Sequence, residues 1–262
     1  MFDDRYSLYS VVIELGAAKK GFPTGILGRA LHSQVLEWLK IGEPSLAEEL
    51  HQSQISPFSI SPLIGKRRSK LTEEGDRFFF RISLLNGSLL QPLLKGLEQQ
   101  DKQIVMLDKF AFRLCHIHIL PGSHSLARAS SYALTTQAPT SSKITLKFHS
   151  ATSFKIDRNT IQPFPLGDSV FNSLLRRWNH FAPEELYFPS VSWQIPVAAF
   201  ELKTYSVQLK KSEIGSEGWV TYLFPDQEQA KIASVLSQFA FFAGVGRKTS
   251  MGMGQVSVNN HG

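Results

Sequence analysis

Residues 244–254 read GVGRKTSMGMG, and this glycine-rich stretch is the most informative segment of the 262-residue chain. Two Gly-x-Gly pairs are separated by five residues, which include the adjacent cations Arg247 and Lys248. Glycine permits positive φ and close backbone approach, so such a loop can present N–H groups to phosphates. A bulged turn that lets the preceding helix pack closely on a sheet is the alternative explanation.

The neighbours of this loop exclude two familiar phosphate-binding motifs. A Rossmann loop follows a strand and opens a helix, whereas here a helix is expected before the loop and a short strand after it. A P-loop needs Gly-Lys-Ser/Thr, and this chain has Arg-Lys-Thr after Gly246. If the loop binds phosphate, Gly246 and Gly252 let the backbone approach it, and Arg247 and Lys248 supply charge.

Hydrophobic periodicity in the first half of the chain predicts the order β-α-β-β-α-β, which is the ferredoxin-like arrangement. A short helix is also expected from about Pro44 to His51. The main elements are expected at Tyr6–Leu15 (strand), Ile26–Lys40 (helix), Phe58–Leu63 (strand), Arg77–Ser83 (strand), Leu84–Gln100 (helix) and Ile104–Leu120 (one strand or more).

The second half predicts the same order again. A hairpin is expected around Lys210–Glu217, and the elements are Lys143–His149 (strand), Asp168–Phe181 (helix), Ala198–Leu209 and Gly218–Phe224 (strands), Gln227–Phe242 (helix) and Gly254–Val258 (strand). We therefore predict an α+β fold of two tandem ferredoxin-like (RRM-like) domains, 1–122 and 143–262. The Ser/Thr/Ala-rich residues 123–142 would form a linker or an irregular segment between them.

Composition indicates a basic protein with hydrophobic cores. Lys and Arg outnumber Asp and Glu by 28 to 22, and this positive balance is compatible with a polyanionic partner without requiring one. The 19 Phe residues are expected to fill two small cores, so they are not all base-stacking groups.

The cysteine count and the N-terminal sequence indicate a soluble cytoplasmic protein. Cys115 is the single cysteine, which excludes an internal disulfide and a multi-cysteine zinc site. The N-terminus opens acidic and lacks the pattern of a signal peptide, and no segment approaches the roughly 20 apolar residues that span a bilayer.

The glycine loop, placed between the last helix and last strand of a duplicated ferredoxin-like chain, resembles that of the repeat-associated CRISPR proteins. Within that group the whole chain is similar to the repeat-processing endoribonucleases, the Cas-six family. Three further segments carry the resemblance: LGRALHS (27–33), LAEELH (46–51), and KFHSATSF (147–154) with Pro163 and FNSLLRRW (171–178).

The resemblance implies a catalytic role for two helix-borne histidines. A histidine placed like His51 is the principal catalytic residue of the family, and a residue placed like His32 is its usual partner. In the family a lysine that assists catalysis often follows the main histidine, but residues 52–58 of this chain contain no lysine. We expect Arg29 to take that third role. The sequence does not tell which of His32 and His51 is the acid and which is the base. The alternative for His51 is a structural role, in which its side chain caps the C-terminal end of a helix.

Histidine suits both proton transfers in RNA cleavage, because its ordinary pKa is about 6.5 and RNA supplies the 2′-OH as nucleophile. The resemblance therefore implies metal-independent cleavage with no cofactor, leaving a 5′-OH and a 2′,3′-cyclic phosphate. His116 and His118 alternate on a strand beside Cys115, but these residues alone do not make a metal site.

Clusters of basic residues suggest where RNA would bind. The turn GKRRSK contains Lys66, Arg67, Arg68 and Lys70, and it is either an RNA clamp or a solvated hairpin tip. Arg176 on the second-half helix is a further candidate, whereas Arg177 could equally pair with a carboxylate.

The function expected from the resemblance is cleavage of a CRISPR precursor transcript at its repeats to give mature guide RNA. The partners would be repeat RNA and other CRISPR effector subunits, with the chain a monomer or homodimer and no membrane involved. The main alternative is a non-catalytic RNA-binding subunit of an effector complex, which would need neither His32 nor His51. A general single-strand RNA chaperone would instead bind with little sequence preference.

Overall fold

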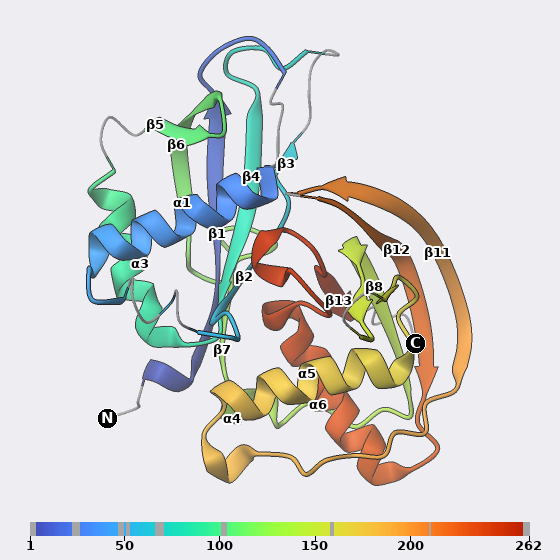
Figure 1. Ribbon diagram of the computed structural model, residues 1–262. Helices are drawn as coiled ribbons and strands as arrows, with labels where there is room; N and C mark the ends of the chain where they lie inside the picture. Colours follow the sequence, from blue (N-terminus) through green and yellow to red (C-terminus); the bar gives the residue numbers. More distant parts are fainter. Residues whose placement is uncertain are drawn as a thin grey trace. The chain divides into compact units, whose positions relative to one another are not determined.

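The chain forms two main β-sheets, and helices pack on each of them (Figure 1). The structure, a computed structural model, describes residues 4–22, 27–46, 50, 53–65, 71–100, 104–157, 160–209 and 211–258. The chain divides into one unit of Met1–Ala129 with Gln208–Lys211 and Ser250–Gly252, and a second unit of Ser130–Val207, Ser212–Thr249 and Met253–Gly262.

The sheet of the first unit has the strand order β2-β4-β1-β6-β5, in which β4 separates β1 from β2. This is the split β-α-β pattern of a ferredoxin-like fold. The strands are β1 (Ser7–Ala17), β2 (Phe58–Ile60), β3 (Ile64–Gly65), β4 (Arg77–Leu84), β5 (Ile104–Leu107) and β6 (Phe110–His118), and the helices are α1 (Leu27–Gly42) and α3 (Leu90–Glu98).

The sheet of the second unit, in the order β11-β12-β8-β13, repeats that pattern. Its main elements are β8 (Lys143–Thr152), α5 (Gly167–Phe181), β11 (Val197–Gln208), β12 (Ser212–Leu223), α6 (Gln227–Ala243) and β13 (Val256–Val258), with the short β9 (Phe154–Lys155) and β10 (Ile161–Gln162) beside them. The prediction of two ferredoxin-like halves is therefore confirmed.

Apolar faces of the helices meet the sheets in two separate cores. In the second unit, Trp178 of α5 packs between Tyr132 and Phe239, with ring centroids 5.0 and 5.3 Å away. In the first unit, Trp38 of α1 stacks on Phe80 of β4. Most described Phe residues are buried, as predicted, although Phe22 and Phe200 are more than half exposed.

Two predicted boundaries were wrong for local reasons. The expected helix from Leu84 begins only at Leu90, because Leu84 still pairs with Tyr9 in the sheet and the Asn86 side chain caps a short 3₁₀ turn. The expected hairpin loop Lys210–Glu217 is much shorter, since β12 already begins at Ser212.

Ordered elements also occur where the sequence predicts a linker. The segment 123–142 contains β7 (Arg128–Ser131) and α4 (Tyr132–Thr135), whose first turn is capped by the Ser131 side chain. Of the short helix expected at Pro44–His51, Leu46 and Leu50 are helical, while 47–49 and 51 lie outside the described residues. Among the described residues, none of the helices combines the length and apolar character that crossing a bilayer requires.

Close contact between α1 and α3 depends on glycine. A Cβ atom added to Gly96 would lie 1.9 Å from the carbonyl oxygen of Trp38, so even alanine must push the two helices apart. We expect Gly96→Ala to lower the free energy of unfolding by roughly 1–3 kcal/mol, the usual effect of overpacking. Urea denaturation followed by circular dichroism measures this, with Lys95→Ala on the exposed face of α3 as control. Equal stability of the two variants would contradict the close packing.

Candidate functional site: the glycine loop and its two flanking surfaces

The glycine loop is wound tightly against its own backbone and its neighbours. Its glycines all adopt positive φ, at 67°, 78°, 90° and 71° for Gly244, Gly246, Gly252 and Gly254. A Cβ atom on Gly246 would lie 2.4 Å from the Ser153 carbonyl oxygen, and one on Gly254 would lie 2.1 Å from that of Val245. Both φ and space therefore require glycine at these positions.

Several loop amides are already used inside the protein. The N–H of Arg247 donates to the Ser153 carbonyl at 3.0 Å, and the N–H of Gly246 donates to the Ser173 hydroxyl at 3.1 Å. The N–H of Gly254 donates to the Ala151 carbonyl at 3.0 Å. These three groups therefore fix the loop to β8, to Ser153 just after it and to α5, rather than facing a phosphate.

A buried arginine holds the start of this loop. Arg177 of α5 is 4% exposed and donates to the carbonyl of Ala243 and, at 2.8 Å, to the Thr249 hydroxyl. Burial lowers the pKa of Arg177 to about 10, which leaves the guanidinium charged at neutral pH. Arg177 thus donates to the last carbonyl of α6 and to a residue within the loop. The sequence had suggested a carboxylate as one possible partner of Arg177, and these two acceptors are a carbonyl and a hydroxyl.

The two loop cations share one carboxylate. Glu213 of β12 accepts from Arg247 at 2.6 Å and from Lys248 through its other oxygen. Burial alone would raise the pKa of Glu213, but the hydrogen bond from Lys248 and the two positive charges outweigh it, so the pKa lies below its ordinary value. Glu213 is therefore ionised at neutral pH and pairs with Lys248, whose backbone is left-handed with φ 55°.

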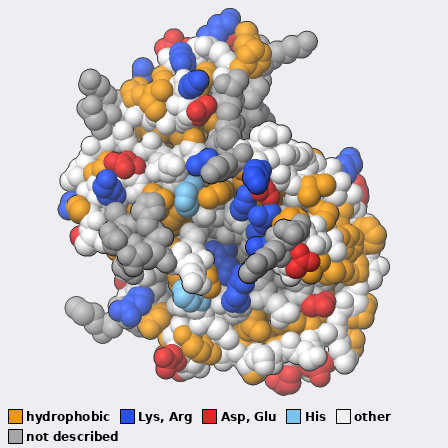
Figure 2. All heavy atoms as spheres, in the orientation of Figure 1, with side chains coloured by type: hydrophobic (Ala, Val, Ile, Leu, Met, Phe, Trp, Pro, Cys, Tyr) orange, Lys and Arg blue, Asp and Glu red, His pale blue; other side chains and the backbone are white. Residues whose placement is uncertain are grey.

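A basic groove of about 560 Å³ lies beside the loop in the second unit. Positions 169, 172, 173 and 176 of α5 recur at helical spacing and form its polar wall. Its lining contains three cations and no carboxylate, and consists of Phe154, Lys155, Ser169, Asn172, Ser173, Arg176, Gly246 and Arg247. Figure 2 shows Lys and Arg side chains gathered over the part of this unit that contains α5 and the loop.

The predicted residues Arg176, Arg247 and Gly246 thus come together in the groove. Lys248 is held at Glu213 instead. Gly252 lies against Pro62, whose nearest atoms would be 3.5 Å from a Cβ atom added at Gly252. The basic turn with Lys66, Arg67, Arg68 and Lys70 lies outside the described residues.

His32 contacts the tip of the glycine loop within the first unit. Its Nδ1 lies 3.0 Å from the carbonyl oxygen of Ser250. Because a carbonyl only accepts hydrogen bonds, Nδ1 carries the proton, and in the neutral ring Nε2 holds the lone pair. Gly28 permits this approach, since a Cβ there would lie 2.2 Å from the Met251 carbonyl oxygen.

Arg29 occupies a different surface of α1. It is exposed and lines an open groove of about 690 Å³ together with Ser33 and Glu37 of the same helix. Asp108 and Lys109 of the β5–β6 turn form the opposite wall. His32 is not part of this groove, and His51 lies outside the described residues, so the roles predicted for Arg29 and His51 stay predictions.

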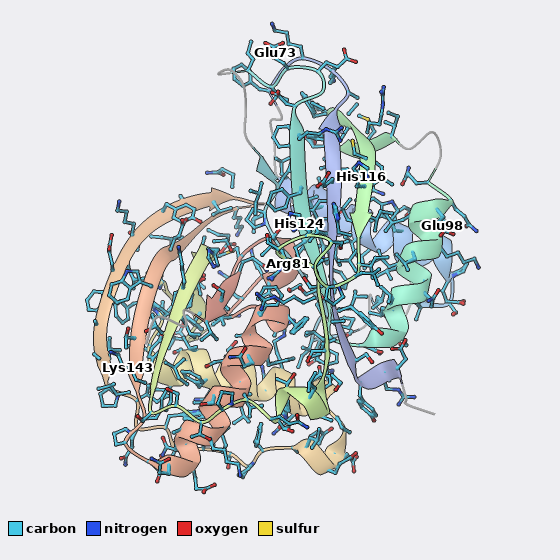
Figure 3. All side chains as sticks on the ribbon, turned by 180° about the vertical axis from the view of Figure 1, so that it is seen from behind. Glu73, Arg81, Glu98, His116, His124 and Lys143 are labelled. Carbon is cyan, nitrogen blue, oxygen red and sulfur yellow. The ribbon has the colours of Figure 1, made fainter. Side chains whose placement is uncertain are left out.

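The histidines on β6 have a structural partner that the sequence did not indicate. His118 Nε2 lies 3.0 Å from an oxygen of Glu14 on β1, and its ring lies 5.4 Å from that of His124. Burial lowers the pKa of His124, as does the nearby His118. His116 and His124 are labelled on this unit in Figure 3.

In the described part of the chain, no three or more His, Cys, Asp or Glu side chains are placed to hold a metal ion.

Comparison with known proteins shows which family the chain resembles. Residues 146–256 match the model of the CRISPR-associated endoribonuclease Cas6 family, and this segment contains α5, α6 and the glycine loop. A product complex of Thermus thermophilus Cas6 (TTHB231) is 26% identical, with a TM-score of 0.84 over 97% of this chain and 100% of that one. The chain is therefore similar to Cas6 proteins, through the family model in its second half and through the fold over nearly its whole length.

Two further structures support the family fold. A product complex of another Cas6 (TTHA0078) is 28% identical, with a TM-score of 0.80 over 97% of this chain and all of that one. A RAMP protein described as binding different RNA substrates is 16% identical, with a TM-score of 0.66 over 96% and 100% of the two chains, and this likeness shows the fold alone. Curated protein sequences gave no match.

The adjacent arginines of α5 offer a matched pair for a test of stability. We expect Arg177→Met to lower the free energy of unfolding by roughly 3 kcal/mol, because two hydrogen bonds from a buried charge are lost. Arg176→Met, on the exposed face, should leave it within about 0.5 kcal/mol of the unchanged protein. Urea denaturation of both variants measures the difference, and equal losses would show that Arg177 does not hold the loop.

Proposed function

We propose that the chain is a metal-independent endoribonuclease that cleaves the repeats of a CRISPR precursor transcript to give mature guide RNA. The match of residues 146–256 to the Cas6 endoribonuclease family model supports RNA processing as the activity, and two similar structures are Cas6 complexes with product and with a substrate mimic. The cytoplasm, where transcripts are made, is the proposed location.

The contact between His32 and the loop tip is the observation that carries the proposed chemistry. The Ser250 carbonyl orients the ring through Nδ1, so in a neutral imidazole Nε2 is the nitrogen that carries the lone pair. We assign His32 as the base that takes the proton from the RNA 2′-OH, whose oxygen then attacks the adjacent phosphorus. A backbone carbonyl that fixes the tautomer is a common way to orient such a histidine.

His51 is assigned as the acid that protonates the departing 5′-oxygen. Its place at the end of the predicted second helix favours the imidazolium form, because the C-terminal end of a helix carries partial negative charge. The bond from phosphorus to the 5′-oxygen breaks as the bond to the 2′-oxygen forms. The products are a 2′,3′-cyclic phosphate and a 5′-OH, and Arg29 is proposed to stabilise the negative charge that develops at phosphorus.

The groove on α5 is proposed to bind the RNA backbone. Lys155, Arg176 and Arg247 line it without an opposing carboxylate in the lining, so it attracts phosphate oxygens. Ser169 and Asn172 add hydroxyl and amide groups along the same wall. The basic turn 66–70 and Lys248 are proposed as further contacts to the same RNA.

Cleavage of end-labelled repeat RNA in EDTA tests the catalytic assignment. We expect cutting at one position, blocked by a 2′-deoxy substitution there, and slowed roughly 10²–10⁴-fold in His51→Ala and in His32→Ala. His180→Ala, an exposed histidine of α5, is the control and should cut normally. Tight binding without cleavage by the unmutated protein would instead favour a non-catalytic RNA-binding subunit.

The salt dependence of RNA binding tests the groove separately. The logarithm of the RNA association constant falls linearly with the logarithm of the salt concentration. Arg176→Gln removes one phosphate contact and should make this slope less steep by about 0.7–0.9. Lys231→Gln on the exposed face of α6 removes the same charge outside the groove and should leave the slope unchanged. Fluorescence anisotropy across a salt series gives both slopes, and identical slopes for the two variants would remove Arg176 from the interface.

A further inference from the structure

The connection between α5 and β11 is held to α6 by a glutamine side chain. Gln229, near the start of α6, donates to the carbonyl of Ser192 at 3.2 Å and accepts from the N–H of Gln194 at 2.9 Å. These two bonds fix the backbone on both sides of Trp193. Figure 1 shows this connection passing the end at which α6 begins.

The Trp193 side chain is held in turn by aromatic packing and by a hydrogen bond. Its ring centroid lies 5.5 Å from that of Phe171 and 6.5 Å from that of Phe224. Its Nε1–H donates to Oδ1 of Asn172, on α5, at 2.9 Å. Because an indole N–H only donates, the amide atom that faces it is the oxygen and not the NH₂ group. Trp193 therefore determines which way the Asn172 amide is turned.

Asn172 is exposed and lines the basic groove one helical turn before Arg176. Since its oxygen is bonded to Trp193, the NH₂ group is what Asn172 offers to a ligand. Ser173 is similar, because its hydroxyl oxygen already accepts from the N–H of Gly246, which leaves its O–H as a donor. Both residues thus add hydrogen-bond donors to the cations of the groove. Such a surface suits phosphate oxygens, which only accept.

We propose that Trp193 is a positioning residue for RNA binding, which turns the NH₂ group of Asn172 toward a phosphate oxygen of the RNA backbone. The inference rests on the proposed function of the groove and adds a residue to it. The lining of the groove described above does not include Trp193, so Trp193 acts through Asn172. The contact is neutral and adds affinity without releasing a counterion, and a phosphate oxygen carries no sequence preference.

Fluorescence anisotropy with repeat RNA and the full chain tests this coupling. Trp193→Phe keeps an aromatic ring beside Phe171 but removes the donor. Trp193→Phe and Asn172→Ala should each weaken RNA binding about three- to tenfold, the usual effect of one lost hydrogen bond. The double variant should bind no more weakly than Asn172→Ala alone. Gln194→Ala, an exposed side chain of the same connection, is the control and should bind like the unchanged chain.

A salt series separates this contact from that of Arg176. Trp193→Phe and Asn172→Ala remove no charge, so their affinities should fall with salt in parallel with that of the unchanged chain. Asn172→Asp keeps an oxygen for Trp193 but replaces the donor with a negative charge, and should weaken binding about tenfold or more.

Gln229→Ala provides a second route, because it frees the backbone around Trp193 without altering the ring. It should weaken RNA binding in the unchanged background and have no further effect in Asn172→Ala. Circular dichroism identifies any variant that is not folded, and the Gln229 and Asn172 variants then carry the test without Trp193→Phe.

Three results would overturn the proposal. Losses that multiply in the double variants, or a changed salt slope in Trp193→Phe, would mean that Trp193 alters the groove by another route. Equal affinities of Asn172→Ala and the unchanged chain, with cleavage intact, would remove this contact and leave the proposed nuclease standing. An unchanged chain that neither binds nor cleaves repeat RNA would refute the proposed function and this inference together.

Discussion

The buried guanidinium of Arg177 is the interaction on which the functional part of the second unit depends. It joins the last carbonyl of α6 to Thr249 inside the glycine loop, so the loop leaves the helix in one defined direction. Burial of a charged group destabilises the folded state unless the group makes hydrogen bonds. The C-terminal end of α6 supplies such an acceptor, because the last carbonyls of a helix have no partner within the helix. The positive φ angles of the glycines then allow the chain to turn back onto β8.

This arrangement separates the structural role of the loop from the binding role proposed for it. Its amides at Gly246, Arg247 and Gly254 are donated within the protein, so the loop backbone serves mainly to hold a shape. In the proposed function, charge for the RNA would come instead from side chains that line the groove with α5. Glu213 offsets part of that charge and fixes Arg247 and Lys248 before any ligand arrives, which lowers the entropy lost on binding.

Local patterns in the sequence were sufficient for the order of elements and for the glycine loop, because periodicity and glycine spacing are encoded within short segments. They set Arg176 apart as an RNA-binding candidate and left a carboxylate partner open for Arg177. They did not predict that Arg177 is buried, because only packing decides which of two adjacent arginines is buried. Glu213 and Glu14 were missed because their partners lie far away in the chain. The contact from His32 to the Ser250 carbonyl spans 218 positions, and no local signal marks it.

The identity of the nucleophile is tested most directly by mass spectrometry of the new ends after cleavage of repeat RNA. Attack by the RNA 2′-OH predicts a 2′,3′-cyclic phosphate on the upstream fragment, which gains one water on acid treatment, and a 5′-OH on the downstream fragment. A 3′-OH paired with a 5′-phosphate would mean that water attacks the phosphorus. That result would contradict the roles proposed for His32 and His51.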